Sequence, residues 1–278
     1  MSALQLAAHK RPRLDLSGPK LTRAFEALIA GSDESGGLER YVTAIKLKTQ
    51  LFSNTLGEGR AAGVSRDTFQ ALCACMPTVR RRIGSHLSHA AFDMLRARVA
   101  ILLEGAADTA TADARIAAFG AGFPDDRAHR WVRDLAAELL HNADPERYPM
   151  MCRWVWDGRA NTGVLREIWH GADVEHARIE VPDSYDAFVA LREELAQFLS
   201  QNGVFRDVIE YVDLLTAQVY AGYISEQGGS YLRTDFSTPE DPMVHVRRLL
   251  GLDAVDERGR SRLKRLDGEA LVVEQHAN

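Results

Sequence analysis

The chain has 278 residues, of which 46% are hydrophobic and 26% charged, and its formal net charge is −5. This length can bury a sizeable core in one or two domains, and the composition excludes a wholly disordered chain. No apolar run approaches the ~20 residues that span a bilayer, so we expect no membrane partner.

The cysteines and the N-terminal residues indicate in which cellular compartment the protein is located. Cys73, Cys75 and Cys152 form an odd, sparse set that provides no disulfide framework. The N-terminal charges follow a short apolar stretch, which is the wrong order for a secretory signal. We therefore expect a cytoplasmic protein whose thiols are small buried side chains.

Charge is unevenly distributed along the chain. Residues 1–105 carry 15 Lys and Arg against 9 acids, a net of +6, whereas residues 173–257 carry 6 against 17, a net of −11. Such polarity is typical of a chain with oppositely charged partners, and equally of two halves that attract each other within one fold.

The apolar periodicity is mainly helical. In chain order it predicts helices over 17–30, 38–57, 65–77, 92–105, 110–119, 125–141, 149–158, 161–171, 188–199, 205–223 and 242–250. Residues 176–181 are the one interior stretch with a strand pattern, and Asp267-Gly268 is the turn dipeptide of a candidate C-terminal hairpin. We expect an all-α, multi-helix array of about eight to ten helices.

Four regions follow from these elements. Residues 1–16 have the composition of a flexible tail, residues 17–105 form a basic helical part, and residues 253–278 form a tail or the candidate hairpin. Residues 106–252 form a central and C-terminal helical part. We expect it to pack with the basic part as one domain.

Carboxylate–histidine spacing gives the first candidate site. Glu138 precedes His141 by three residues, and Glu167 precedes His170 by three, so on a helix each pair shares one face. Glu-x-x-His is the element that di-iron carboxylate bundles use twice, although no further glutamate ligand is marked here. The pattern predicts iron or another transition metal as a cofactor, and acid–histidine surface pairs are the alternative.

An arginine cluster gives the second candidate site. Residues 65–87 read as a helix, a break at Pro77 and a second helix that carries Arg80, Arg81 and Arg82. This outline is similar to a helix-turn-helix whose arginines contact DNA or RNA. A solvated charged face is the alternative, and the turn is short for that motif.

Two weaker candidates remain. The irregular loop 228–242 offers Tyr231, Arg233 and Asp235 to a ligand or partner. Of the four tryptophans, all between residues 131 and 169, Trp156 fits an apolar helical stripe least well, which makes it the candidate pocket or interface aromatic.

No catalytic constellation is complete in this sequence. The fingerprints of nucleotide-binding loops and serine hydrolases are absent. Our leading hypothesis is a helical accessory, adaptor or regulatory protein that acts through protein–protein contacts. A metal-dependent oxidoreductase that uses the Glu-x-x-His pairs is the first alternative, and a nucleic-acid-binding regulator that uses Arg80–Arg82 is the second.

Overall fold

A computed structural model describes residues 11–33, 36–171, 177–229, 243–254, 260–264 and 270–272. Its α-helices are α1 (Gly18–Asp33), α2 (Glu39–Leu56), α3 (Arg66–Ala74), α4 (His89–Leu103), α5 (Ala112–Gly120), α6 (Trp131–Ala143), α7 (Val164–Glu167), α8 (Tyr185–Gln201), α9 (Val208–Gly229) and α10 (Val244–Leu249). Short 3-10 helices join them: η1 (Arg60–Gly63), η2 (Ile83–Leu87), η3 (Thr109–Thr111) and η4 (Arg127–His129). The predicted all-α, multi-helix fold is confirmed.

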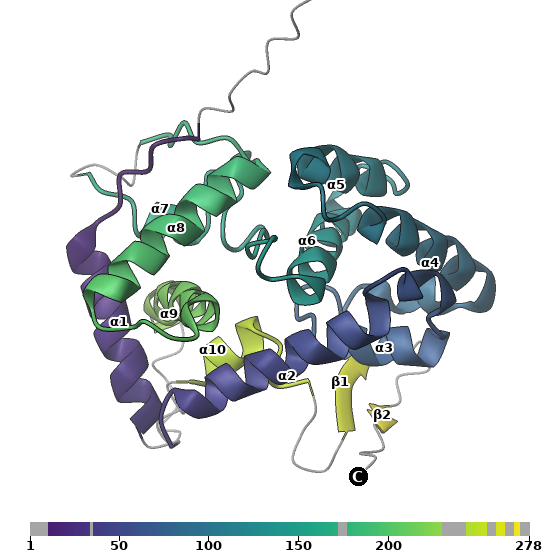
Figure 1. Cartoon of the computed structure of the whole chain (residues 1–278), viewed down its shortest axis with the longest axis horizontal. Coiled ribbons are helices and arrows are strands. Elements are labelled where there is room, and N and C mark those ends of the chain that lie inside the picture. The colour runs from purple at the N-terminus through teal and green to yellow at the C-terminus, as the bar shows by residue number, and fades with distance from the viewer. Residues whose placement is uncertain are drawn as a thin grey trace, which may run out of the picture.

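Helix α2 runs along the molecule and joins its two sides (Figure 1). On one side, α1, α8 and α10 pack against α9, and on the other side α4 packs against α5, η1 and η2. Helix α2 itself contacts α6, α9, α3 and η1. One continuous hydrophobic cluster includes residues from both sides, so the basic and the central parts of the chain share a core.

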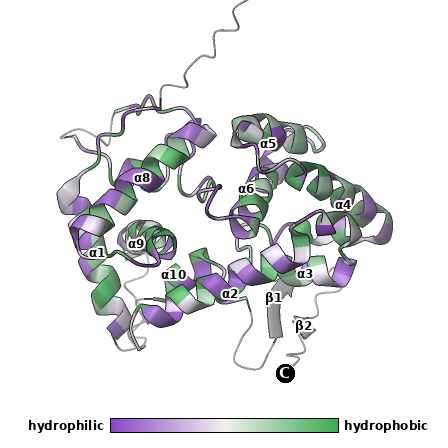
Figure 2. Ribbon diagram, in the orientation of Figure 1, coloured by the Kyte–Doolittle hydropathy of each residue, from purple (hydrophilic) through white to green (hydrophobic). Residues whose placement is uncertain are grey.

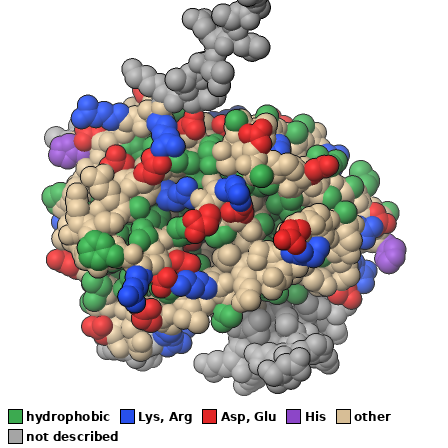
Figure 3. All heavy atoms as spheres, viewed as in Figure 1, with side chains coloured by type: hydrophobic (Ala, Val, Ile, Leu, Met, Phe, Trp, Pro, Cys, Tyr) green, Lys and Arg blue, Asp and Glu red, His purple; other side chains and the backbone are tan. Residues whose placement is uncertain are grey.

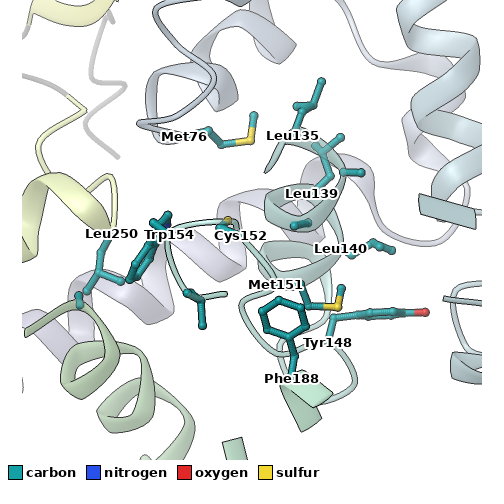
Figure 4. Close-up of a cluster of buried hydrophobic side chains, with 14 of the residues drawn as sticks. Met76, Leu135, Leu139, Leu140, Tyr148, Met151, Cys152, Trp154, Phe188 and Leu250 are labelled. Atoms are coloured by element: carbon teal, nitrogen blue, oxygen red, sulfur yellow. The ribbon is translucent and has the colours of Figure 1, made fainter. Parts of the chain in front are cut away.

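The aromatic stretch 147–171 lies in the middle of this core. Figure 4 shows Met151, Cys152 and Trp154 among side chains of α6 and α8 and next to Leu250, the residue that follows α10. The predicted helix over 149–158 is wrong, because the chain forms turns there and folds back on itself. The amides of Val164 and Leu165 donate hydrogen bonds to the carbonyls of Trp154 and Val155, at 3.1 Å each.

Three other expectations need correction. Residues 11–16 are not a free tail, because Leu14 is buried and the carbonyl of Asp15 accepts a hydrogen bond from the His170 amide at 2.8 Å. Residues 177–181 do not form a strand. Near the C-terminus, β1 (Arg260–Lys264) and β2 (Ala270–Val272) pair antiparallel, but Asp267-Gly268 lies outside the described residues, so the hairpin stays a prediction.

The turn after α10 packs against the backbone at the end of α3. Gly251 has a φ of +69°, and a Cβ at this position would lie 1.9 Å from the carbonyl oxygen of Cys75. Next to it, the Lys48 ammonium donates a hydrogen bond to the Leu250 carbonyl at 2.9 Å. This close approach joins the C-terminal helix to α2 and α3.

We expect Gly251→Ala to destabilise the fold more than Gly203→Ala. Gly203 also has a positive φ, of +88°, but nothing lies within 4 Å of the position of its Cβ. The left-handed conformation should cost each variant about 1 kcal/mol. The steric clash should cost Gly251→Ala about 1–3 kcal/mol more in the free energy of unfolding, measured by chemical denaturation. Equal losses would contradict the close packing of Gly251 on Cys75.

Candidate functional site

Helix α4 is apolar on two faces. Phe92, Leu95, Val99 and Leu102 are buried in the core. On the outward face, Ala90, Met94, Ala97 and Ile101 follow one another at intervals of four, three and four residues, and all four are exposed. We call these four residues the α4 stripe. Met94 and Ile101 each expose 64% of their surface, and Figure 2 shows hydrophobic residues along the α4 ribbon. The helix also carries Asp93, Arg96 and Arg98, so it has two separate apolar faces and is not hydrophobic all round.

A second exposed stripe without charged residues lies on α2. Its buried face carries Ile45, Phe52 and Leu56, whereas Leu47 and Leu51 are 61% and 45% exposed. Asn54 continues the same face, three residues after Leu51. We call Leu47, Leu51 and Asn54 the α2 stripe. It carries no charge, which is unusual for the exposed side of a helix on a protein surface.

A groove of about 910 Å³ lies at the C-terminal ends of α2, α4 and α6. Asn54 of the α2 stripe lines it, and so does Glu104, which follows Ile101 of the α4 stripe by three residues. Nine of the 18 lining residues are alanine or glycine, so the floor is small-chained and allows another backbone to approach closely. We call it the α2–α4 groove. Figure 3 shows hydrophobic side chains at the surface between charged ones on the face of the molecule where α2 runs.

Three helix C-termini meet at the α2–α4 groove. Helices α2, α4 and α6 end at Leu56, Leu103 and Ala143, and residues at or next to each end line the groove. The C-terminus of a helix carries about half a negative charge on its unsatisfied carbonyls. Arginine side chains cap two of these ends, because Arg60 donates to the Ser53 and Asn54 carbonyls of α2 and Arg115 donates to the Leu102 carbonyl of α4.

Among the described charged side chains that line the groove, one carboxylate has no ionic partner. The Arg60 guanidinium pairs with Glu58 at 2.8 Å and also donates to the carbonyls of Ser53 and Asn54. Arg147 pairs with Asp144. The Glu104 amide donates to the Ala100 carbonyl at 2.8 Å, but its carboxylate makes no hydrogen bond or ion pair among the described residues. Glu104 follows the C-terminal end of α4, where the helix dipole disfavours a negative charge.

The predicted metal ligands Glu138 and His141 belong to a buried polar stripe on α6. Asp134, Glu138 and His141 lie at intervals of four and three residues, and each contacts a different element. Asp134 accepts from Arg153 at 2.7 Å, Glu138 pairs with Lys48 of α2 at 3.4 Å, and His141 Nε2 lies 3.0 Å from Asp213 of α9. These contacts hold α6 against its neighbours.

Both ring nitrogens of His141 are engaged, since Nδ1 lies 2.8 Å from the Tyr148 carbonyl oxygen. Burial by itself lowers the pKa of His141, but the Asp213 charge and the hydrogen bonds to Asp213 and Tyr148 outweigh it. The pKa of His141 is therefore raised above its ordinary value of 6.5. A protonated imidazole has no lone pair for a metal.

The second predicted pair is not brought together on a helix. Helix α7 ends at Glu167, His170 is exposed beyond it, and burial raises the pKa of the half-buried Glu167 carboxyl. Within the described residues, no three His, Cys, Asp or Glu side chains are placed to hold a metal ion. The metal hypothesis stays a prediction without a ligand set in this part of the chain.

The three arginines of the second candidate site lie in turns before η2, so the predicted second helix of a helix-turn-helix is wrong. Arg80 is 4% exposed and forms a bidentate ion pair with Asp253, at 2.8 and 3.1 Å. Arg81 and Arg82 are exposed. Arg80 is thus a structural residue, and nucleic-acid binding by the other two stays a prediction.

The remaining candidates do not form a site. Tyr231, Arg233 and Asp235 lie outside the described residues. Trp156 is 1% exposed and donates its indole N–H to the Val181 carbonyl at 3.3 Å, so the structure places it in the core and not at a pocket or an interface.

A second cavity, of about 470 Å³, lies between α5, α6 and the start of α8. The charged side chains Arg133, Asp183 and Asp113 of this cavity already have partners within the fold. Arg133 pairs with Asp183 through both guanidinium nitrogens, and Asp113 accepts a hydrogen bond from the Tyr185 amide at 2.8 Å. Burial raises the pKa of the Asp183 carboxyl, although Arg133 opposes this. The α2–α4 groove is therefore the better candidate.

No protein-family model, curated protein or solved structure matches the chain. Among the helices that the structure describes, none is both long and apolar enough to cross a membrane.

The sequence contains an indication of the α4 stripe that the periodicity of the buried face alone does not reveal. The buried face of α4 is recognised from Phe92, Leu95, Val99 and Leu102. Met94 and Ile101 lie outside this face, and with Ala90 and Ala97 they mark a second apolar face on a helix that also carries Asp93, Arg96 and Arg98. The α2 stripe and the groove itself need the packing of α2, η1, α4 and α6, which no local pattern provides.

The raised pKa of His141 predicts how stability depends on pH. The folded state binds the proton more tightly than the unfolded state, so this contribution is fully present below about pH 6.5 and is lost as pH rises through the folded pKa. Asp213→Asn should cost about 3 kcal/mol of unfolding free energy and flatten this dependence, because the pair is buried. The control Asp93→Asn makes the same change in the exposed Asp93–Arg96 pair, which contains no histidine, and should leave the slope unchanged. Denaturation from pH 5.5 to 9 tests this, and an unchanged slope in Asp213→Asn would contradict it.

Proposed function

We propose that this chain is an accessory or adaptor protein that binds another protein through the α4 stripe, next to the α2–α4 groove. The observation that carries the proposal is the second, exposed apolar face of α4. Met94 and Ile101 have no core to cover on this side, and their exposure holds apolar surface in water. Contiguous exposed apolar surface that is rimmed by polar residues is characteristic of interaction sites.

The size of the surface supports this use. Fully burying a large apolar side chain is worth about 1.5–3 kcal/mol, and the α2 and α4 stripes together expose about half or more of four such side chains. A partner that covered both stripes and filled the groove would therefore gain several kcal/mol, before the cost of association. The floor of small residues lets this partner pack closely.

The chemistry elsewhere in the described residues supports a binding role over catalysis. The buried ionic side chains Asp134, Glu138 and His141 are each paired within the fold. Burial raises the pKa of the Cys73 and Cys152 thiols well above their ordinary value, which keeps them protonated and unreactive. All three cysteines are free, which is in keeping with a reducing cytoplasm.

We expect a photo-crosslinking residue at position 101 to capture a specific protein in the native cells. The same residue at position 29 should not capture it, because Ile29 is an exposed apolar residue of α1, at the other end of the molecule (Figure 1). Met94→Glu should abolish the crosslink from position 101, since it places a charge on the same exposed stripe two turns away. Mass spectrometry of the crosslinked species provides the measurement.

Two results of this experiment would contradict the proposal. If positions 29 and 101 capture the same set of proteins, or if Met94→Glu leaves the crosslink unchanged, the α4 stripe is not the binding site. Circular dichroism of each variant shows whether the helices are intact.

A further inference from the structure

We infer that the cavity of about 470 Å³ between α5, α6 and the start of α8 binds a small, uncharged organic molecule that has an apolar body and one hydroxyl group. No residue of α4 lines this cavity, so the site is separate from the α4 stripe and goes beyond the proposed function. Three features of the cavity carry this assignment: its apolar floor, the pairing of its charges and one hydroxyl that the fold leaves available.

The floor of the cavity is apolar and buried. Ala137 of α6, Met151 and Phe188 of α8 line it, and each is at most 3% exposed. Figure 4 shows the Met151 side chain next to the ring of Phe188. A thioether and an aromatic ring both make favourable contacts with another aromatic ring. An apolar molecule, and an aromatic one in particular, would therefore be stabilised on this floor.

The space itself follows from the packing of α5. This helix contributes the small residues Ala117 and Gly120 to the wall of the cavity. Because α5 packs against α4 and α8 packs against α9, the cavity lies between the two sides of the molecule that α2 joins (Figure 1). Its volume is within the range of about 300–1,000 Å³ that small-molecule sites occupy. Ala117 and Asp183 are exposed, so the cavity is open to solvent.

The charged groups of the cavity balance one another and do not select an ion. The Arg133 guanidinium pairs with Asp183 through both of its terminal nitrogens. The Asp113 carboxylate accepts a hydrogen bond from the Tyr185 amide at 2.8 Å, at the N-terminus of α8, where the helix dipole is positive. Burial raises the pKa of the Asp183 carboxyl although Arg133 opposes this, as expected beside an apolar space. A charged ligand would lose hydration here without gaining a counter-charge among the described lining residues.

One polar group of the cavity is available to a ligand. Ser184 is the N-cap residue of α8, but its side chain accepts no capping hydrogen bond, and its hydroxyl has no partner among the described residues. A serine hydroxyl both donates and accepts hydrogen bonds, and so does the hydroxyl of an alcohol. An alcohol can therefore bond to Ser184 in either direction without bringing a charge into the cavity.

The test measures binding to the full chain by NMR chemical-shift titration. The four probes share an aromatic ring and differ at the other end: phenethyl alcohol, phenethylammonium, phenylacetate and ethylbenzene. We expect phenethyl alcohol to bind roughly fivefold more tightly than either ion, because the ions lose hydration without compensation. The amides of α5 and of the start of α8 should shift most on binding, whereas those of the α4 stripe should not shift.

Two comparisons locate the bound probe. Ala117→Leu fills the cavity and should weaken phenethyl alcohol roughly tenfold. Ala118→Leu makes the same change at an exposed α5 residue that does not line the cavity, and it should have no effect. Ser184→Ala should weaken phenethyl alcohol about threefold through the lost hydrogen bond, but should leave ethylbenzene, which has no hydroxyl, unchanged.

The outcomes test the ligand class and the site separately. If phenethylammonium or phenylacetate binds as tightly as the alcohol, charge governs the cavity and the assigned class is overturned. If Ala117→Leu and Ala118→Leu bind phenethyl alcohol equally, or if no probe shifts the amides of α5 and α8, the site itself is overturned. The proposed function stands or falls independently, by the crosslink from position 101.

Discussion

The polar stripe buried on α6 is the constraint on which the rest of the structure depends. Asp134, Glu138 and His141 fix the 147–171 stretch, α2 and α9, respectively, around one helix. Removing one partner of such a pair leaves an uncompensated buried charge, which typically costs about 3–5 kcal/mol. Lys48 also bonds to the Leu250 carbonyl, so the same cluster positions the C-terminal helix. The α4 stripe and the α2–α4 groove thus lie on the outside of a helix packing that these buried ion pairs specify.

This arrangement explains why a groove exists at the ends of three helices. The Lys48–Glu138 ion pair sets α2 against α6, and η1 fills the angle between α2 and α4. The C-terminal ends of α2, α4 and α6 then converge without a side chain large enough to fill the space between them. The groove is lined mainly by small side chains as a consequence of this packing.

The sequence predicts the helices well and the site poorly, for physical reasons. The periodicity of the helices that became α8 and α9 is local, and so is the Ser65 cap of α3, which accepts a hydrogen bond from the Thr68 amide. The 149–158 segment has helical spacing, but tertiary bonds between 154–155 and 164–165 override it. Glu138 and His141 stand out in the sequence because they are charged in a core helix. Their partners Lys48 and Asp213 lie far away in the chain, so spacing alone suggests a metal where the fold provides ion pairs.

The central claim is that the α4 stripe serves a partner and not the core. The most direct measurement is the unfolding free energy of the double variant Met94→Gln, Ile101→Gln, compared with Leu95→Ala on the buried face of the same helix. Because both stripe residues are 64% exposed, we expect the double variant to unfold within about 0.5 kcal/mol of the parent. Leu95→Ala should lose about 2–5 kcal/mol. A loss in the double variant as large as that of Leu95→Ala would show that the stripe is part of the core, and would contradict the account.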